Sequence, residues 1–370
     1  MEIAIKELGA IITGNTPSKK VKEYWNSKDI CFVKPDIIAD EGVDDITESN
    51  EYISEFARKK ARIVKENAIF VTCIGSIGKI GIAGSGEYAF NQQINVIIPN
   101  EKVRSKYLAY NLYFNKSKLV AIANAPVVPI INKSQFGDFI INIDTDINKQ
   151  DKAIEVLDKL TKIIQQRKNE IMYLDNLIKA RFVEMFGNPY NNEKNFPMMT
   201  VADVIEFTGG AQPDKKYFEY KPTEDNIRLI QIRDYKTDNY ITYIPKMMAK
   251  RFCDADDIMI GRYGPPIFQI LKGIEGSYNV ALMKATPKMG NKEFIRYFLK
   301  QECLFNYLDG LSQRTAGQSG IDMPALKSYP FPYPPLELQE EFEKFSKQVN
   351  KSKVAVLKNY SQGGVLSYAN

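Results

Sequence analysis

A run of glycines between Glu66 and Ile82 is the first stretch whose residue types and spacing could do chemistry. The sequence ENAIFVTCIGSIGKIGI places Gly75, Gly78 and Gly81 after an apolar run. Many phosphate-binding loops begin as a strand that opens into glycines, because glycine lets backbone N–H groups approach a phosphate closely. The stretch therefore raises the question of a nucleotide-binding site.

The spacing satisfies neither of the phosphate-binding patterns that it suggests. A P-loop has the form GxxxxGK followed by Ser or Thr, but Cys73 stands at the first glycine position and Ile80 follows Lys79. A dinucleotide fingerprint needs a helix after its glycines, whereas KIGIAGSGEYAF is rich in turn residues. We therefore predict a hairpin or tight turn here.

The chain contains no histidine, the usual general base near neutral pH and the commonest metal ligand. Ser-His-Asp triads, Cys-His pairs, Cys2His2 zinc sites and HExxH chemistry are therefore excluded. The four cysteines are scattered without a CxxC pair, which predicts reduced, buried thiols. Since no two carboxylates can be paired across a cleft, the sequence predicts no catalytic centre, metal site or cofactor in this chain.

Length and composition indicate a soluble globular protein of about two domains. The chain has 370 residues, of which 44% are hydrophobic and 26% charged. No apolar run approaches the ~18 residues of a membrane span, and MEIAIKELGAI lacks the features of a signal peptide. We expect a cytoplasmic protein without a membrane partner. The net charge of +5 is compatible with a polyanionic partner.

The glycine stretch has a second copy later in the chain. AIFVTCIGSIG (68–78) corresponds to DIMIGRYGPPI (257–267), with Gly75 matching Gly264 at an offset of 264 − 75 = 189. In the second copy Gly264 is followed by Pro265 and Pro266, which have no backbone N–H to offer a phosphate. This difference also argues against a nucleotide site.

Further segments repeat in the same order, which predicts a duplicated unit. AIITGNTPSKK (10–20) resembles EFTGGAQPDKK (206–216), FNQQINVIIPN (90–100) resembles SYNVALMKATP (277–287), and PIINKSQFGDFIINI (129–143) resembles SGIDMPALKSYPFPY (319–333). DTDINKQDKAI then matches YPPLELQEEF, with Gln150 on Gln339. An offset near 189 is too long for a solenoid repeat, so each unit is a domain with an added element.

The added element is a long helix. Between Asn148 and Phe186 there is neither proline nor glycine, apolar residues recur at steps of three and four, and GNP follows as a stop. Such a helix is roughly 55 Å long. Its counterpart begins at Leu336 after two prolines. The helices either pack on their own domains or pair as an antiparallel coiled coil, which the near-heptad apolar stripes favour.

The sequence thus predicts an α+β protein in which two pseudo-repeated domains are separated by two long antiparallel, coiled-coil-like helices. The predicted domains are 1–147 and 188–335, the central helix is 148–187, and the C-terminal helix with its tail is 336–370. Strands are expected at AIFVTCI, INVIIP, FIINI, IRLIQI and DIMIGRY, and helices at 104–123 and 291–311.

These ordered features resemble the specificity subunit of type I restriction–modification systems. The resemblance rests on the tandem ENAIFVTCIGSIG and DADDIMIGRYG segments, on the helix ending RFVEMFGNP, and on GQSGIDMPALKSYPFPYPPLELQEEF (317–342) with its partner PIINKSQFGDFIINIDTDINKQDKAI. It covers nearly the whole chain, and 317–342 is its most specific part. The second helix departs from the pattern, because it is shorter and ends in SQGGVLSYAN.

The resemblance implies two target-recognition domains, each reading half of a split sequence in double-stranded DNA. It also implies that the long helices dock two methyltransferase subunits, which bind S-adenosylmethionine and methylate adenine, and that motor–nuclease subunits using ATP and Mg join them. This chain would then be a non-catalytic recognition subunit with no cofactor of its own. A helix of this length could hold two readers about one DNA turn, ~34 Å, apart.

Base edges are read by Arg, Lys, Asn and Gln, and phosphates are held by Lys, Arg and hydroxyls. In the first domain the predicted DNA-binding residues are Asn15, Thr16, Lys19, Lys20, Lys34, Arg58, Arg62, Ser76, Lys79, Gln92 and Gln93. In the second they are Gln212, Lys215, Lys216, Gln231, Arg233, Arg251, Arg262, Tyr263, Arg314 and Gln318. A solvated surface role is the alternative for each. Arg233 and Arg262 are stronger candidates than the lysines because strand-like apolar residues flank them.

Two other classes of protein stay open from the sequence. One is a coiled-coil scaffold that carries two protein-binding modules. The other is an RNA-binding module without DNA specificity, which would need aromatic side chains exposed on a sheet. The base sequence of a DNA target is not encoded in any motif of the chain, since base preference depends on loop geometry.

Overall fold

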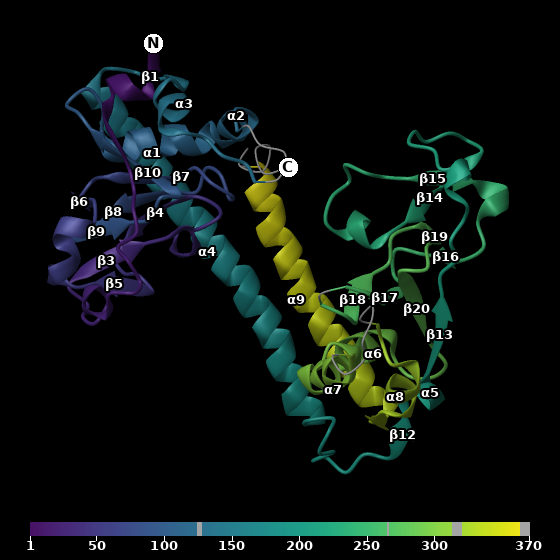
Figure 1. The fold of residues 1–370 in the computed structure, drawn as a ribbon. Coiled ribbons are helices and arrows are strands. Elements are labelled where there is room, and N and C mark those ends of the chain that lie inside the picture. Colours follow the sequence, from purple (N-terminus) through teal and green to yellow (C-terminus); the bar gives the residue numbers. More distant parts are fainter. Residues whose placement is uncertain (124–127, 265, 313–319, 363–370) are drawn as a thin grey trace. The chain divides into compact units, whose positions relative to one another are not determined.

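The computed structural model describes residues 1–123, 128–264, 266–312 and 320–362, with side chains up to Leu357. The chain divides into two compact units, Met1–Gln166 and Arg167–Asn370, and each is described by itself (Figure 1). Both units combine helices with mixed β-sheets, which confirms the predicted α+β class.

The first unit holds the strands β1 to β11, the helices α1 to α3 and the beginning of α4. Their bounds are β1 (Glu2–Ala4), β2 (Gly9–Thr13), β3 (Ile30–Val33), β4 (Val43–Ile46), β5 (Glu51–Ile53), β6 (Ile63–Lys65), β7 (Ile69–Thr72), β8 (Ile80–Ala83), β9 (Glu87–Phe90), β10 (Ile94–Pro99), α1 (Ser105–Phe114), α2 (Lys116–Ala121), α3 (Lys133–Gly137), β11 (Ile140–Asn142) and α4 (Ile147–Phe186).

Two larger sheets organise the first unit. One has the strand order β2-β10-β7-β8-β4 and the other β5-β3-β9-β6, while β1 pairs with β11. All four residues of β7 are buried, so its continuous apolar run reflects burial on both faces. β7 and β8 form an antiparallel hairpin in which Gly75 and Gly78 have positive φ angles. The predicted hairpin is therefore confirmed, and the glycines serve the turn.

The second unit holds the remaining elements. Their bounds are β12 (Met198–Thr200), α5 (Val201–Val204), β13 (Ile205–Gly209), β14 (Asn226–Ile230), β15 (Tyr243–Pro245), β16 (Phe252–Cys253), β17 (Ile258–Gly261), β18 (Gln269–Lys272), β19 (Gly276–Tyr278), β20 (Leu282–Pro287), α6 (Lys292–Leu299), α7 (Glu302–Ser312), α8 (Met323–Ser328), β21 (Pro330–Pro332) and α9 (Leu336–Gln362).

The second unit repeats the strand order of the first. Its sheet β13-β20-β17-β18 corresponds to β2-β10-β7-β8, and its sheet β15-β14-β19-β16 corresponds to β5-β3-β9-β6. The pair β12–β21 corresponds to β1–β11. The predicted duplication is thus confirmed strand by strand. β4 is the exception, because the described part of the second unit has no strand in the matching place beside β18.

The long helix α4 has defined ends. The Asp146 carboxylate accepts a hydrogen bond from the Asn148 N–H at 2.9 Å, close to the helix start. At the other end Gly187 has a φ of 72°, and its N–H donates to the Val183 carbonyl at 2.8 Å. This left-handed glycine is a common helix terminator, as the GNP sequence predicted.

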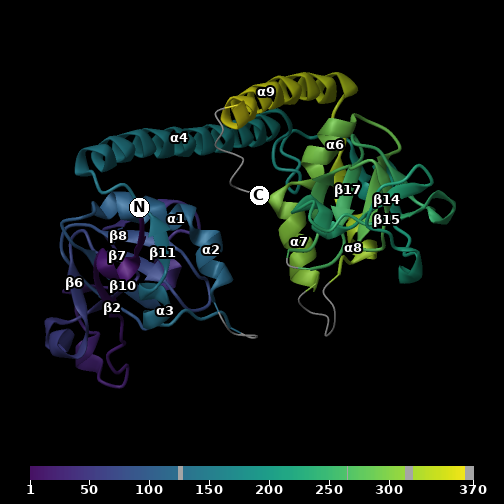
Figure 2. The same cartoon turned by 90° about the horizontal axis from the view of Figure 1, so that it is seen from above.

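Within the second unit, the end of α4 and α9 lie side by side (Figures 1 and 2). The rings of Phe182 and Phe342 are 5.3 Å apart, Arg181 donates to Glu341 at 2.8 Å, and Lys353 pairs with Asp175. Asp175 on α4 meets Lys353 on α9, whereas Phe182, which comes later on α4, meets Phe342, which comes earlier on α9. The two helices therefore run antiparallel. This confirms the predicted antiparallel pairing for these segments.

Among the described residues, no helix combines the length and the apolar character that a membrane crossing requires. The four cysteines are unpaired, with Cys73 and Cys253 buried and Cys31 and Cys303 half-buried. Burial raises the pKa of the Cys73 and Cys253 thiols to about 11, which keeps them protonated at neutral pH.

Candidate nucleic-acid interface

One edge of the smaller sheet gathers most of the predicted residues of the first unit. β3 and β9 are parallel, with Val33 opposite Phe90, so the residues that follow them emerge at the same edge. Lys34 follows β3, and Asn91, Gln92 and Gln93 follow β9. The Asn91 N–H donates to the Val33 carbonyl at 3.1 Å, which ties the two strand ends together.

The second unit has the same edge. β14 and β19 are parallel, with Ile230 opposite Tyr278, and the Asn279 N–H donates to the Ile230 carbonyl at 3.0 Å. Gln231 therefore occupies the place of Lys34, and Val280 the place of Gln92. We call these two surfaces the parallel-strand edges.

A glycine brings a third segment onto each parallel-strand edge. A Cβ at Gly14 would lie 2.1 Å from the Asn91 carbonyl oxygen, and one at Gly210 would lie 1.9 Å from that of Asn279. Only glycine permits so close an approach. The residues that follow, Asn15 and Ala211, donate their N–H groups to Phe90 and Tyr278 at 2.9 and 3.1 Å.

In the first unit the side chains at this edge bond to one another. The Thr16 hydroxyl donates to Gln92 Oε1 at 2.8 Å, and the Asn15 amide donates to the Lys60 carbonyl at 2.7 Å. The backbone N–H of Arg62 donates to Asn15 Oδ1 at 2.9 Å, and its guanidinium donates to the Thr13 carbonyl. The structure thus places Asn15, Thr16, Arg62 and Gln92 together. Gln93 joins them by accepting from Asn91 at 2.8 Å.

Several predicted cations of the first unit are already paired with carboxylates. Lys19 and Lys34 both bind Glu51, and together they lower the pKa of its carboxyl. Lys79 pairs with Asp40 at 2.8 Å. Their charges are therefore partly neutralised within the unit. Lys20 is exposed, and its backbone N–H donates to the Ser18 hydroxyl at 3.3 Å.

Arg58 and Ser76 lie apart from the first edge in different ways. Arg58 binds Glu55 and Glu87, and Glu87 is the first residue of β9, so Arg58 is at the opposite end of that strand. Ser76 is exposed on the β7–β8 turn, which starts beside the edge because the Cys73 N–H donates to the Gln93 carbonyl.

In the second unit, arginines and amides take the place of the lysines. Gln231 and Arg233 both donate to the Thr242 hydroxyl, at 3.0 and 3.1 Å. The Arg262 guanidinium reaches the Val280 carbonyl at 3.4 Å and lies 5.2 Å from the Tyr263 ring centre. The Arg251 carbonyl accepts the Tyr278 N–H at 3.0 Å, which brings Arg251 to the same edge.

The remaining predicted residues of the second unit divide into two groups. Gln212 is exposed after Gly210, and its amide donates to the Pro213 carbonyl at 3.2 Å. Lys215 is exposed, and Lys216 lies 3.5 Å from the Asp214 carboxylate. Arg314 and Gln318 lie outside the described residues.

Sequence reasoning missed two residues of these edges. Val280, which is 39% exposed, matches Gln92 in the strand register but is apolar, so a search for polar side chains passes over it. Glu51 was missed because only the fold brings it to Lys19 and Lys34, 32 and 17 residues away. The repeat of 90–100 in 277–287 was a signal for Val280, but residue by residue it pairs Val280 with Gln93, and only the strand register pairs it with Gln92.

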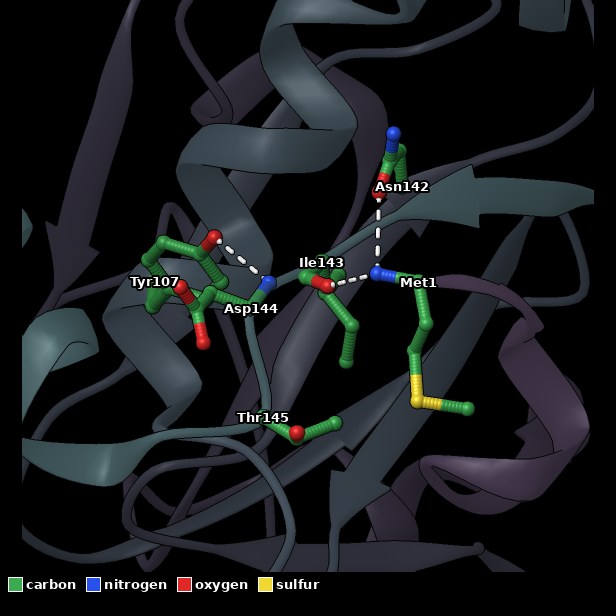
Figure 3. Close-up of a pocket in the computed structure, with 6 residues that line it drawn as sticks. All are labelled: Met1, Tyr107, Asn142, Ile143, Asp144 and Thr145. Atoms are coloured by element: carbon green, nitrogen blue, oxygen red, sulfur yellow. Dashed lines mark hydrogen bonds between the residues drawn. The ribbon is translucent and has the colours of Figure 1, made fainter.

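A shallow polar pocket of about 360 Å³ lies elsewhere in the first unit, lined by Met1, Tyr107, Asn142, Ile143, Asp144 and Thr145 (Figure 3). The Met1 amine donates to the Ile143 carbonyl and to Asn142 Oδ1, and the Asp144 N–H donates to the Tyr107 hydroxyl. The two Met1 bonds join the residue before β1 to the end of β11, and the Tyr107 bond joins α1 to the chain that follows. The Ile143 N–H also donates to the Met1 carbonyl at 3.0 Å, and in the second unit the corresponding bond runs from the Tyr333 N–H to the Pro197 carbonyl at 2.8 Å. The pocket is therefore part of a repeated strand junction.

With this geometry in place, comparison with known proteins identifies the family. Residues 1–173 and 193–362 match the family model of the type I restriction modification DNA specificity domain. The match covers most of the chain, so the chain belongs to this family, and the resemblance inferred from its sequence is confirmed.

Two curated relatives carry the same description. The chain is 27% identical over 237 residues to the type I restriction enzyme MjaIX specificity subunit of Methanocaldococcus jannaschii, covering 58% of this chain and 54% of that protein. It is 27% identical over 161 residues to the EcoR124I/EcoR124II specificity subunit of Escherichia coli, covering 41% and 39%. The chain thus spans about half or less of the length of these relatives.

A solved structure supports the fold. The type I restriction–modification S subunit from M. genitalium covers 99% of this chain and 93% of its own length, with a TM-score of 0.54. At 13% identity this similarity shows a shared fold.

Proposed function

We propose that this chain is the DNA sequence-specificity subunit of a type I restriction–modification complex and recognises a bipartite DNA target. The observation that carries the proposal is the parallel-strand edge, which occurs twice with the same backbone hydrogen bonds and different side chains. Thr16 and Gln92 in one unit stand where Gln212 and Val280 stand in the other. Two readers of different half-sites on one framework are expected to differ in this way.

The chemistry of the edges suits base reading in the major groove. Amides such as Gln92 and Gln212 recognise adenine, arginines such as Arg262 recognise guanine, and an apolar side chain such as Val280 contacts the thymine methyl group. Duplicated units that read separate half-sites account for a split target, as in other two-fold DNA-binding proteins.

The proposal includes partners for the long helices. On α4, Val156, Leu160 and Ile163 are exposed at a spacing of four and three residues, so they share one face of the helix. An exposed apolar face of this kind suits a protein partner. We assign it to a methyltransferase subunit, with two such subunits in the complex and motor–nuclease subunits joining them in the cytoplasm.

The proposed division of labour assigns the chemistry to those partners. S-adenosylmethionine on the methyltransferase would supply the methyl group for adenine, and ATP and Mg would serve the motor–nuclease. The residues of this chain would bind the DNA and orient it, without a cofactor of their own and without catalysis.

The RNA-binding alternative is less well supported. It needs aromatic side chains exposed on a sheet for base stacking. One strand aromatic, Phe252 of β16, is 54% exposed, whereas Phe32, Phe70, Tyr88, Phe90 and Tyr278 are buried. They belong to the core, so the requirement for an aromatic sheet face is not met by these residues.

The proposed function is tested by mapping methylated adenines in the genome of the source organism with and without this gene. We expect a split motif that loses its methylation when the gene is deleted and regains it on complementation. A methylation map that is unchanged by deletion would contradict the proposal. A coiled-coil scaffold without DNA specificity predicts that unchanged map.

A further inference from the structure

The duplication makes it possible to ask which side chains the two parallel-strand edges share and which they do not. Residues that both edges keep are expected to serve a role that the two units have in common. Two shared pairs have backbone roles: Gly14 and Gly210 allow the close approach, and the buried Asn91 and Asn279 hold the turn before the next strand.

A third shared pair is exposed. Arg62 precedes β6, and Arg251 precedes β16, at an offset of 251 − 62 = 189. Each of these strands pairs antiparallel with the strand that carries the edge, with Ile63 opposite Ala89 and Phe252 opposite Ser277. The two arginines therefore occupy the same position, beside Phe90 and Tyr278.

Neither arginine is neutralised within its unit. Throughout the residues that the structure describes, no carboxylate lies within ion-pair distance of the Arg62 or the Arg251 guanidinium. Lys19, Lys34, Lys79 and Arg58 are all paired with carboxylates by contrast. The repeat also aligns Lys19 with Lys215 and Lys20 with Lys216, but Lys19 and Lys216 each meet a carboxylate. Among the described residues, the arginines are therefore the aligned cations that have no carboxylate partner in either unit.

The positions around this arginine differ between the units. Thr16 corresponds to Gln212, Lys34 to Gln231, and Gln92 to Val280. The phosphate backbone is the same in every half-site, whereas the bases differ. A contact with the phosphate backbone can therefore use the same cation in both units. Contacts with the bases need different side chains around that cation.

We propose that Arg62 and Arg251 are matched phosphate anchors, one in each unit, and that the neighbouring unshared residues read the bases. This inference rests on the proposed DNA-specificity function. The structural alternative is that Arg62 braces β2, because its guanidinium donates to the Thr13 carbonyl. Among the described residues, Arg251 is bonded through its backbone carbonyl, which accepts the Tyr278 N–H. The two arginines therefore share their position and their charge, but not a hydrogen bond from the guanidinium that braces a strand.

The test measures DNA binding by the full chain in complex with its methyltransferase partner. Fluorescence anisotropy would compare the duplex carrying the mapped motif, duplexes with one base pair changed in either half, and a random duplex, across a salt series. The variants are Arg62→Ala, Arg251→Ala, the double variant and the charge-preserving Arg62→Lys and Arg251→Lys. Lys65→Ala is the matched control, since Lys65 is an exposed cation at the other end of β6.

Each alanine variant should lower the magnitude of the slope of log K against log salt by about 0.9, and the double variant by about 1.8. The affinity should fall by the same factor for every duplex, lysine should restore most of the slope, and Lys65→Ala should leave it unchanged. Thermal unfolding of the alanine variants should match the wild type.

Other outcomes would overturn the anchor assignment. A change in preference at a single base pair would make the arginine a base reader. An unchanged slope, or a lowered unfolding temperature that lysine does not restore, would leave only the bracing role. If the wild-type complex bound the mapped duplex no better than random DNA, the proposed function itself would fail, which is distinguishable from these results.

Discussion

At the scale of the residue, the two edges use their charges differently. In the first unit Glu51 takes up Lys19 and Lys34 at once, whereas in the second Gln231 and Arg233 share the neutral Thr242 hydroxyl. Surface ion pairs of this kind contribute little, below about 1 kcal/mol, so a phosphate could compete for the lysines. Arg233 needs no such exchange, because its guanidinium donates to a neutral hydroxyl.

Arg262 is expected to be a base reader rather than a phosphate contact. It has no shared counterpart, since Cys73 stands at its place in the first unit, and Tyr263 lies beside its guanidinium. Arg262→Ala should reduce discrimination against a changed base pair by about 1–3 kcal/mol, roughly tenfold or more, and should affect random DNA much less. Competition binding with the purified complex measures both values.

The control for Arg262 is Lys272→Ala. Lys272 is exposed at the other end of the β17–β18 pair, opposite Ile258, so its removal changes the charge without touching the edge. If Arg262→Ala weakened binding to cognate and random duplexes equally, Arg262 would be a phosphate contact.

At the scale of the element, a buried glutamine holds the start of each long helix against its unit. Gln150 donates to the carbonyls of Lys102 and Asp144 and accepts the Arg104 N–H at 2.8 Å. Gln339 donates to the Pro334 carbonyl and accepts the Asn291 N–H, both at 2.8 Å. Both side chains are completely buried. The repeated glutamine thus fixes the direction in which each helix leaves its unit.

Replacing Gln339 should destabilise the second unit. Gln339→Ala leaves the Asn291 N–H and the Pro334 carbonyl without their partner in a buried site, so the free energy of unfolding should fall by roughly 1–3 kcal/mol. Urea denaturation followed by circular dichroism measures this change. Gln348→Ala, at an exposed position of the same helix, should change it by less than about 0.5 kcal/mol. Equal effects of the two variants would show that the buried amide carries no special role.

The proposed role of the apolar face of α4 in binding the methyltransferase subunit can be tested by introducing a charge on that face. Leu160→Glu places a carboxylate on the face formed with Val156 and Ile163, and burial of that charge in an interface costs about 3 kcal/mol or more. Affinity for the methyltransferase subunit should therefore fall by roughly a hundredfold. Titration calorimetry of the two purified subunits gives the value.

Lys162→Glu is the matched control for this face, since Lys162 is exposed on α4 but lies two residues away, on another side of the helix. It should bind the methyltransferase subunit like the wild type. Similar losses for both variants would point to a general electrostatic effect instead of an apolar docking face.

At the scale of the whole molecule, each unit is expected to control one half of the target. Gln92→Ala should relax base preference at a position in only one half of the split motif, and Gln212→Ala in only the other half. Each amide–adenine pair is worth about 1–3 kcal/mol of discrimination. The measurement is the methylated-adenine map of a strain carrying each variant.

The double variant Gln92→Ala with Gln212→Ala serves as the internal check. Its motif should be relaxed at both positions, each to the extent seen in the single variants, because the two side chains share no partner. A single variant that altered both halves of the motif would contradict the assignment of one half-site to each unit.

Much of the fold was predictable because it is encoded in local patterns. The apolar runs predicted β7, β10 and β17, and the absence of proline and glycine after Asn148 predicted α4. β5 and β6 were not predicted, because their three residues lie outside any longer apolar run and take their shape from partners elsewhere in the chain, whereas the three-residue β11 lies within the apolar run FIINI. The candidate site followed the same rule. Residue types nominated Arg62 and Arg251, but the pairing of β6 with β9 and of β16 with β19 was needed to place them at equivalent positions.

The sequence by itself determined the duplication, the fold class, the long helices and the family, because repeats, periodicity and motifs are properties of the chain. Only the tertiary structure decided which charges are free. Lys19 and Arg62 are alike as exposed basic residues in the sequence, yet one meets Glu51 and the other meets no carboxylate among the described residues. The reason is physical: the charge a ligand encounters depends on neighbours within a few ångströms, and those neighbours come from distant parts of the chain.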